Sequence, residues 1–349
     1  MQRRFLVLYI VLLLLQISCV LAYSRSDDLG ELGAEQVSEK SELEQMRQQL
    51  KELKATTSDA VSAFNKLDTS PLKKGLKEFH LFCRPASHEI APGKTIECLT
   101  YNGLLPGPPL RVKEGQLVRI IVHNQLEQNT SFHLHGMVLP GSVDGLPNSK
   151  SGLIKPGQTY AYQFVAKPVG TYWYHPQIMH AEQKIKGMYG AFIVEPDEPI
   201  KTTDEDIVLI LGDTTANKMQ ESASAANKPV TSTSTSKVVY LINGKTAPAI
   251  PGIEVRPNSR VRLRVINAAQ HSVPLHITGH KFEIVSLNGN LSGEQTSRDT
   301  ITCGVSDRMD LEFTANNPGL WSMASELIEQ STNNGQFPGG IACVIRYVE

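Results

Sequence analysis

The chain from residue 76 to its end consists of short apolar and β-branched runs that Pro, Gly and Asn separate from one another. A strand of roughly four to eight residues fits between such turns, whereas an amphipathic helix needs roughly ten or more residues of sustained periodicity. The pattern therefore predicts an all-β chain of two β-sandwich domains, 76–198 and 199–349. The expected strands are residues 96–101, 117–123, 160–166, 190–194, 207–211, 238–242, 260–266, 276–286, 309–314 and 340–347.

The two sets of strands also resemble each other in their turns. Asn102-Gly103 and then Pro106-Gly107 precede residues 111–121, and Asn243-Gly244 and then Pro251-Gly252 precede residues 260–266 in the same order. Such pairs are common turn formers, but their repeated order indicates a duplicated domain. Residues 214–237 are rich in Ser, Thr and Ala, which predicts a mobile surface loop inside the second domain.

The N-terminus has the pattern of a secretory signal peptide over residues 1–22. Arg3 and Arg4 precede an apolar run that ends at Leu15, and Ala22 is a suitable cleavage residue. A lipoprotein signal that uses Cys19 is the less favoured alternative. The pattern predicts export, either secreted or periplasmic, and no membrane span in the mature chain.

Residues 23–75 are expected to be helical. Apolar residues from Leu43 to Leu67 recur at alternating spacings of three and four, as in a coiled coil. Two interpretations remain open, an oligomerising coiled coil and an amphipathic helix that lies on its own domain.

The charge balance excludes one class of partner. The chain has 34 Lys and Arg against 35 Asp and Glu, a net charge of −1, so no basic surface for nucleic acid is expected.

Four cysteines follow the signal peptide. Cys83 and Cys98 flank an expected hairpin turn, and Cys303 and Cys343 lie in strand-like runs of the second half. In an exported chain we expect disulfides 83–98 and 303–343, with buried thiols as the alternative.

The histidines are the candidate functional residues. His133 and His135 alternate on one strand, so both imidazoles point to the same face, and His175 ends an aromatic strand. Imidazole nitrogens gathered from two strands suit copper or zinc, and copper(II) binds nitrogen sites more tightly. His80, His88 and His123 are expected to be surface or structural residues. The candidate metal ligands are His133, His135, His175, His180, His276 and His280.

The order of several motifs makes the resemblance to a family specific. Phe132-His-Leu-His-Gly, Asp144-Gly145, Gly170-Thr-Tyr-Trp-Tyr-His and Gly187-Met-Tyr-Gly-Ala-Phe-Ile-Val-Glu-Pro resemble the first cupredoxin domain of the multicopper oxidases. The second half, which includes Leu241-Ile-Asn-Gly, is similar to a later cupredoxin domain. The resemblance implies two cupredoxin-like Greek-key domains, as in two-domain copper oxidases and copper nitrite reductases. Such proteins are typically homotrimers with a metal site between the first domain of one subunit and the second domain of the next.

The resemblance also implies roles for the histidines. His133 and His135 match the pair that supplies one ligand to a type 2 copper and one to a type 3 copper, and His175 matches another type 3 ligand. The next ligand position holds Gln177, for which His180 is a possible substitute. His276 or His280 would be supplied by a second domain or subunit.

A type 1 copper site, which needs a Cys thiolate and two His, is missing. Pro176 stands where nitrite reductases have the Cys, Gln183 falls near their second His, and only Met188 remains of the set. Residues 321–330, where laccase-like oxidases carry a His-Cys-His run, have neither residue type.

These departures lead to two hypotheses. The first is an exported copper-binding oxidoreductase with a His-only, type 2 or type 3-like copper site and a small-molecule substrate or electron donor. The alternative is a non-catalytic, degenerate cupredoxin that acts as a copper-binding or interaction module.

Overall fold

The computed structural model describes residue 48 and residues 74–145, 152–177, 180–198, 203–215, 219–221, 238–291, 297–333 and 335–349. The predicted signal peptide and nearly all of the predicted helical segment lie outside the described residues. No helix within the described part of the chain is long and apolar enough to cross a membrane.

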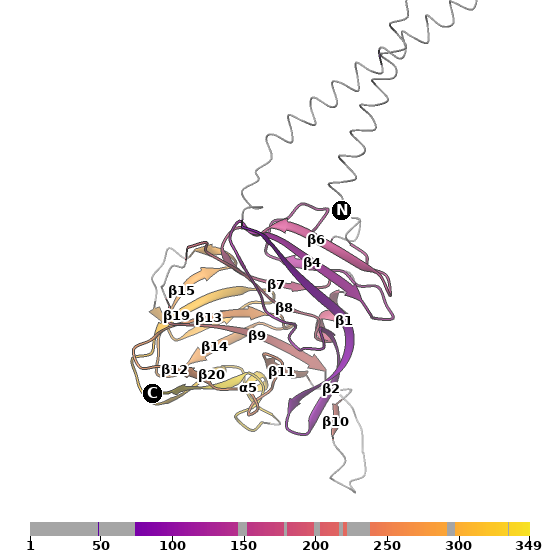
Figure 1. Cartoon of the computed structure of the whole chain (residues 1–349). Coiled ribbons are helices and arrows are strands. Elements are labelled where there is room, and N and C mark those ends of the chain that lie inside the picture. Colours follow the sequence, from indigo (N-terminus) through magenta and orange to yellow (C-terminus); the bar gives the residue numbers. More distant parts are fainter. Residues whose placement is uncertain are drawn as a thin grey trace, which may run out of the picture. The chain divides into compact units, whose positions relative to one another are not determined.

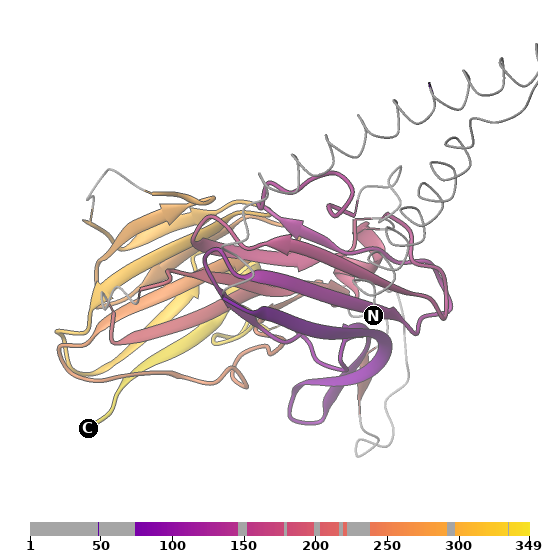
Figure 2. The ribbon, with the colours of Figure 1, turned by 45° about the horizontal axis from the view of Figure 1, so that its top comes forward.

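The described chain is all-β, as predicted, and its strands form two pairs of sheets (Figures 1 and 2). The first half, together with β10 from the second half, forms a five-stranded sheet in the order β10-β2-β1-β4-β6, and the first half also forms a four-stranded sheet in the order β3-β8-β7-β5. Their strands are β1 (Leu76–Ala91), β2 (Lys94–Tyr101), β3 (Leu110–Lys113), β4 (Leu117–Asn124), β5 (His133–His135), β6 (Thr159–Val165), β7 (Gly170–His175), β8 (Gly190–Glu195) and β10 (Met219–Glu221).

The second half contributes the sheets β11-β9-β13-β19-β15-β16, on which β17 pairs with β15, and β12-β21-β20-β14-β18. Their strands are β9 (Glu205–Thr215), β11 (Val238–Ile242), β12 (Ile253–Val255), β13 (Arg260–Asn267), β14 (Val273–Ile277), β15 (Phe282–Leu287), β16 (Asn290–Leu291), β17 (Ser297–Arg298), β18 (Thr300–Cys303), β19 (Arg308–Thr314), β20 (Leu320–Ser325) and β21 (Ala342–Tyr347). Two short helices complete the described chain, α4 (His180–Ile185) and α5 (Ile328–Ser331).

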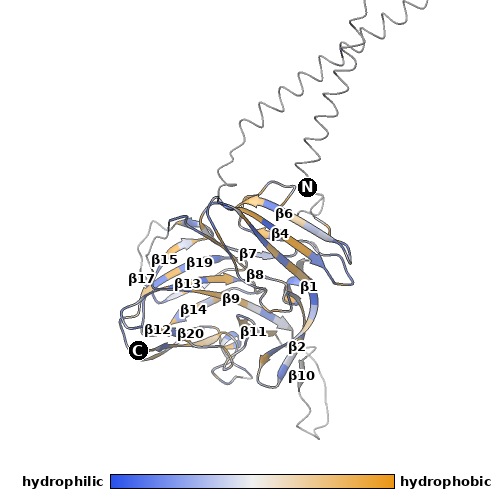
Figure 3. Cartoon of the chain, in the orientation of Figure 1, coloured by the Kyte–Doolittle hydropathy of each residue, from blue (hydrophilic) through white to orange (hydrophobic). Residues whose placement is uncertain are grey.

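Alternating side chains explain why these segments form sheets. In β4 the residues Val118, Ile120 and Val122 are fully buried, and the residues between them are partly exposed. The same alternation is visible along other strands in Figure 3. Each sandwich has its own apolar core, and a third core, which includes Trp173 and Ile266, lies between the two sandwiches.

The predicted duplication is visible in two asparagines. Asn102 and Asn243 both have positive φ, 61° and 49°. The side chain of Asn102 accepts the N–H of Phe82 and donates to the carbonyl of His80, at 2.7 and 3.0 Å. Asn243 makes the equivalent bonds with the backbone of β9, at 2.8 and 2.9 Å. The echo seen in the sequence is therefore a repeated structural corner.

Three details of the predicted secondary structure were wrong. Residues 276–286 are not one strand, because Gly279 at φ +70° forms a turn between β14 and β15. Of the predicted loop 214–237, residues 214–215 end β9 and residues 219–221 form β10, which pairs with β2, and the rest lies outside the described residues. Helices α4 and α5 were not expected, since each is too short to show a helical period.

The predicted disulfides are also wrong, because all four cysteines are buried free thiols. Cys83 lies opposite Tyr101 in the β1–β2 ladder, and Cys98 lies opposite Ala86. Cys303 on β18 and Cys343 on β21 are separated by β14 and β20, about 14 Å at the usual strand spacing, and a disulfide spans less than about 7 Å between Cα atoms. Burial raises the pKa of Cys98 to about 11 and that of Cys343 to about 12, so both thiols are protonated at neutral pH.

A buried polar network joins the two sandwiches. The hydroxyl of Thr171 on β7 donates to Asp310 Oδ1 on β19 (2.6 Å) and accepts from Arg264 Nη1 on β13 (2.8 Å). Arg264 also donates two 2.7 Å bonds to Asp206 and lies 3.4 Å from Asp310. Because Thr171, Trp173 and His175 alternate along β7, all three point toward the second sandwich.

Candidate metal centre

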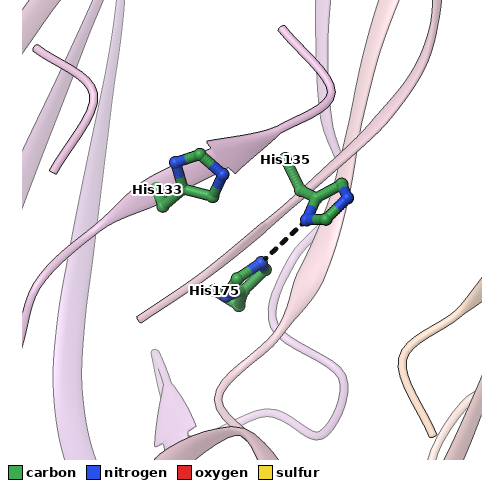
Figure 4. A group of neighbouring side chains, drawn as sticks. All are labelled: His133, His135 and His175. Carbon is green, nitrogen blue, oxygen red and sulfur yellow. Dashed lines mark hydrogen bonds between the residues drawn. The ribbon is translucent and has the colours of Figure 1, made fainter. Parts of the chain in front are cut away.

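Strands β5 and β7 bring three of the predicted histidines together. In their antiparallel ladder His133 lies opposite His175, and His135 lies opposite Trp173. His133 and His135 share a face because they are two residues apart on β5. One ring nitrogen from each of His133, His135 and His175 lies within 4.8 Å of the others. Figure 4 shows the three side chains together.

Hydrogen bonds orient two of these rings. His133 Nδ1 lies 3.0 Å from the backbone oxygen of Asp144 and 3.2 Å from its carboxylate. His175 Nδ1 donates to the carbonyl of Pro176 at 3.0 Å. Each Nδ1 therefore carries a proton, and in the neutral ring the lone pair is on Nε2. Acceptors behind a histidine in this way are typical of metal ligands.

The Asp144 contact depends on the residue that follows it. Gly145 has φ +73°, and a Cβ at this position would lie 2.0 Å from the backbone oxygen of Phe132. Glycine thus allows the turn that places Asp144 beside His133. The sequence showed Asp144-Gly145 as part of a motif, but its contact with His133 could not be inferred from spacing.

The third contact joins His135 and His175. His135 Nδ1 lies 3.3 Å from His175 Nε2, the dashed line in Figure 4. Two nitrogens that bind one metal at about 2.0–2.1 Å and a tetrahedral angle are about 3.3 Å apart. The separation therefore suits either a hydrogen bond or a shared ion, and the three imidazoles fit a copper or zinc ion.

Trp173 closes one side of this cluster. Its ring is fully buried and lies 4.3 Å from the His175 ring and 5.0 Å from the His135 ring, measured between centroids. Lys184 of helix α4 is 2% exposed and lies 5.8 Å from the centroid of Trp173. Burial lowers the pKa of Lys184. One side of the cluster is thus bounded by an aromatic ring, over which a buried amine lies.

The other predicted ligands do not join this cluster in the described chain. His180 begins α4, and its side chain lies outside the described residues. His276 on β14 donates to or accepts from Thr300 Oγ1 at 2.9 Å, through Nδ1. His280 contacts the carbonyl of Thr278 and the hydroxyl of Tyr347 at 3.3 and 2.7 Å, so both ring nitrogens are in use. His276 and His280 line a cavity of about 600 Å³ in the second sandwich.

The positions that correspond to a type 1 copper have other roles in this fold. Gln183 is fully buried, accepts from Thr130 Oγ1 at 2.8 Å and donates to the carbonyl of Asn129 at 2.8 Å. Met188 is buried in the core of the first sandwich. Gln183 is thus a structural residue, and none of the described cysteines belongs to the histidine cluster.

Comparison with protein families decides the assignment. Models described as multicopper oxidase match residues 84–199 and 205–349, about three quarters of the chain together. The chain belongs to the multicopper oxidase family. The predicted superfamily is therefore confirmed, and this superfamily is one of copper oxidoreductases.

Curated relatives of this multicopper oxidase homologue are longer proteins. Copper resistance protein A of Escherichia coli is 32% identical over an alignment of 241 residues, and the match covers 56% of this chain and 40% of that protein. Multicopper oxidase MmcO of Mycobacterium tuberculosis is 28% identical over an alignment of 251 residues, and the match covers 64% of this chain and 49% of that protein. The chain therefore spans less than half the length of each.

Solved structures confirm the cupredoxin-like fold. The blue copper oxidase from Nitrosomonas europaea superposes with a TM-score of 0.70 at 30% identity, over 78% of this chain and 86% of that chain. A copper nitrite reductase from the same organism superposes with a TM-score of 0.64 at 22% identity, over 78% and 94%, and shows the fold alone.

Proposed function

We propose that this multicopper oxidase homologue is an exported copper oxidoreductase whose copper is held by histidines, without a thiolate ligand. The ligands are His133, His135 and His175. The observation that carries the proposal is their arrangement, in which three ring nitrogens converge while Asp144 and the Pro176 carbonyl hold the Nδ1 atoms of two rings. Export is supported by the signal-peptide pattern of residues 1–22.

Copper at this site would supply one-electron chemistry by changing between its cuprous and cupric states. The protein's own contribution is orientation and exclusion of water. Asp144 fixes the ring of His133, and Trp173 covers the rings of His135 and His175. His175 is 1% exposed, so an electron donor or small substrate would approach from the side of His133 and His135, whose rings are partly exposed.

A second copy of the chain is proposed to complete the site. Three protein ligands leave a position open, and His276 is a better fourth ligand than His280. Among the described residues, His276 Nε2 has no hydrogen-bond partner and the ring lines a cavity, whereas both nitrogens of His280 are bonded. A homotrimer in which His276 of one copy reaches the cluster of the next would bring these ligands together.

A specific observation favours a second candidate function, a non-catalytic copper-binding module. The usual entry point for electrons is missing, and its positions hold Pro176 and the hydrogen-bonded Gln183. Such a protein would bind copper at the same histidines without sustaining turnover.

The test is copper loading of the mature protein, followed by desalting, metal analysis and electron paramagnetic resonance. We expect at least one retained copper per chain with a type 2 signal and no intense blue band. His135→Ala is expected to lose this copper. His271→Gln is expected to keep it, because His271 is a half-exposed histidine whose ring contacts Asp213 and Tyr240 and is not part of the cluster.

Oxygen consumption with a cuprous or phenolic reductant then separates the two functions. Copper-dependent consumption that disappears in His135→Ala supports the oxidoreductase, and retained copper without turnover supports the binding module. A protein that retains no copper in the native form contradicts both. Loss of copper in His276→Ala but not in His280→Ala, together with sedimentation as a trimer, is the expected result for a site shared between copies.

A further inference from the structure

A second pair of histidines lies on the outer face of the sheet that contains β1 and β4. His80 is on β1 and His123 on β4, where His123 is directly opposite Phe82. Their neighbours Leu81 and Val122 are fully buried, so His80 and His123 point outward, and the His80 side chain is 47% exposed. His80 Nδ1 lies 3.0 Å from His123 Nε2.

Each ring of this pair has an oxygen behind its outer nitrogen. His80 Nε2 lies 3.3 Å from Glu78 Oε1, and His123 Nδ1 lies 3.0 Å from Thr159 Oγ1. When both oxygens accept a hydrogen bond, the lone pairs of the two neutral rings are on the inner nitrogens, which face each other. One proton between these nitrogens satisfies the pair, and a metal ion would satisfy both lone pairs at once.

The surrounding residues hold this arrangement. Glu78 Oε2 accepts a 3.1 Å bond from Arg119, whose guanidinium also donates to Gln163 at 2.9 and 3.0 Å. The carboxylate of Glu78 thereby neutralises the positive charge of Arg119, which lies next to the histidine pair. The ring of Phe82 stacks on His123 at 4.4 Å and 10°, which fixes the plane of that imidazole. The groups are therefore ordered without a metal.

We propose that His80 and His123 form a second, solvent-facing copper(II) site, separate from the cluster of His133, His135 and His175. Two nitrogens bound to one ion at about 2.0–2.1 Å in adjacent positions of a square are about 2.9 Å apart, against about 3.3 Å in a tetrahedron. The observed 3.0 Å is close enough to either separation for one ion to join the two rings after a small movement, and copper(II) binds imidazole nitrogens more tightly than zinc does.

A modest movement completes the site. The rings lie nearly parallel, at 14° and 5.3 Å between centroids, so the inner nitrogens point almost directly at each other. Both rings must tip toward a common ion, and the exposure of His80 permits this movement. Water molecules are the oxygen ligands that a tetragonal ion would add, because the carboxylate of Glu78 is held at the outer nitrogen of His80 and by Arg119.

The test is titration of the full mature chain with Cu²⁺ alone, in the His135→Ala background, where the first cluster is disabled. Calorimetry and electron paramagnetic resonance are expected to show one copper(II) per chain with a signal of nitrogen and oxygen ligands. His123→Gln and His80→Gln are each expected to abolish this equivalent, and His271→Gln serves as the matched control. Thr159→Val, which removes the oxygen behind His123, is expected to weaken binding by about 10- to 100-fold.

Circular dichroism must show that each variant is folded. An unchanged copper equivalent in folded His80→Gln and His123→Gln overturns the proposal, as does loss of the same equivalent in His271→Gln. Because the measurement is made without the first cluster, failure here leaves the proposed function standing. Tighter binding of Zn²⁺ than of Cu²⁺ would overturn the assignment of this site to copper(II).

Discussion

Replacing Arg264 by methionine is expected to destabilise the protein strongly, because it leaves buried carboxylates without their partner. Arg264 is 5% exposed and bonds Asp206, Thr171 and Asp310. Asp206 is 30% exposed and lies 3.7 Å from Arg111, so water and Arg111 can stabilise its negative charge when Arg264 is absent. Asp310 is 8% exposed and would keep the hydrogen bond from Thr171 and the more distant charge of Arg262.

The size of the effect follows from that difference. Breaking a buried pair by removing one partner costs about 3–5 kcal/mol, and here most of the cost comes from Asp310 alone, so we expect about 3 kcal/mol at pH 7. Arg260→Met is the matched control on the same strand. Arg260 is 49% exposed and shares Glu312 with Arg262, so its loss should cost less than about 1 kcal/mol.

Two further measurements isolate the buried charge. Burial raises the pKa of Asp310 in the native protein, and this pKa should rise further without Arg264. A folded protein that holds a carboxyl with a raised pKa becomes more stable as the pH falls and the carboxyl is protonated. The loss of unfolding free energy in Arg264→Met should therefore shrink between pH 7 and pH 5. Asp310→Asn in the Arg264→Met background removes the charge but still accepts from Thr171, and it should restore most of the stability.

Urea unfolding followed by circular dichroism gives the free energies, and the slope of the transition shows whether the two sandwiches still unfold together. A deficit for Arg264→Met no larger than that for Arg260→Met would refute the reasoning. So would a double variant that is less stable than Arg264→Met alone.

Two other predictions concern stability. His88 Nε2 lies 2.9 Å from the carbonyl of Gly244 in the second sandwich, and burial lowers the pKa of this histidine. The folded protein therefore favours the neutral ring. The contribution of His88 to stability is present above the unfolded pKa of 6.5 and is lost as the pH falls through the lower folded pKa. Thermal unfolding from pH 8 to pH 5 should show a smaller acid loss for His88→Gln, and an identical profile contradicts this. Asn267 is fully buried, and its Nδ2 lies 2.9 Å from three carbonyl oxygens that share its two N–H groups. Asn267→Ala should therefore cost about 3 kcal/mol in urea unfolding, whereas Asn290→Ala, at an exposed position, should cost little. Equal midpoints would show that water replaces these bonds.

Sequence patterns predicted what is local in this molecule. The alternation of Val118, Ile120 and Val122 identifies a half-buried strand without any tertiary information. The two asparagine-glycine turns indicated that the second domain repeats the first. His133 and His135 could be assigned to one face by their spacing. The imidazoles alone allowed copper or zinc, and the affinity order of nitrogen ligands together with the resemblance to the family favoured copper.

The remainder depends on register and on contacts between distant segments. Cys83 and Cys98 could not be excluded as a disulfide until the ladder placed Cys83 opposite Tyr101. The network of Arg264 and Thr171 joins residues 93 positions apart, and no periodicity indicates it. The outward pair of His80 and His123 looked like ordinary surface histidines, because only the parallel pairing of β1 with β4 brings the two rings together.

The short strand β5 has a consequence for local order. It is an edge strand of three residues, and β7 is its one partner in the sheet order of the described chain. A shift of the β5–β7 register by one residue would turn both imidazoles to the opposite face and place Leu134 on the face that contains His175. An ion held by histidines of both strands binds only the aligned form, so its binding free energy would add to that of the pairing. Metal supply would then govern how often this edge of the sheet opens, and amide hydrogen exchange at Leu134 would slow as copper is added.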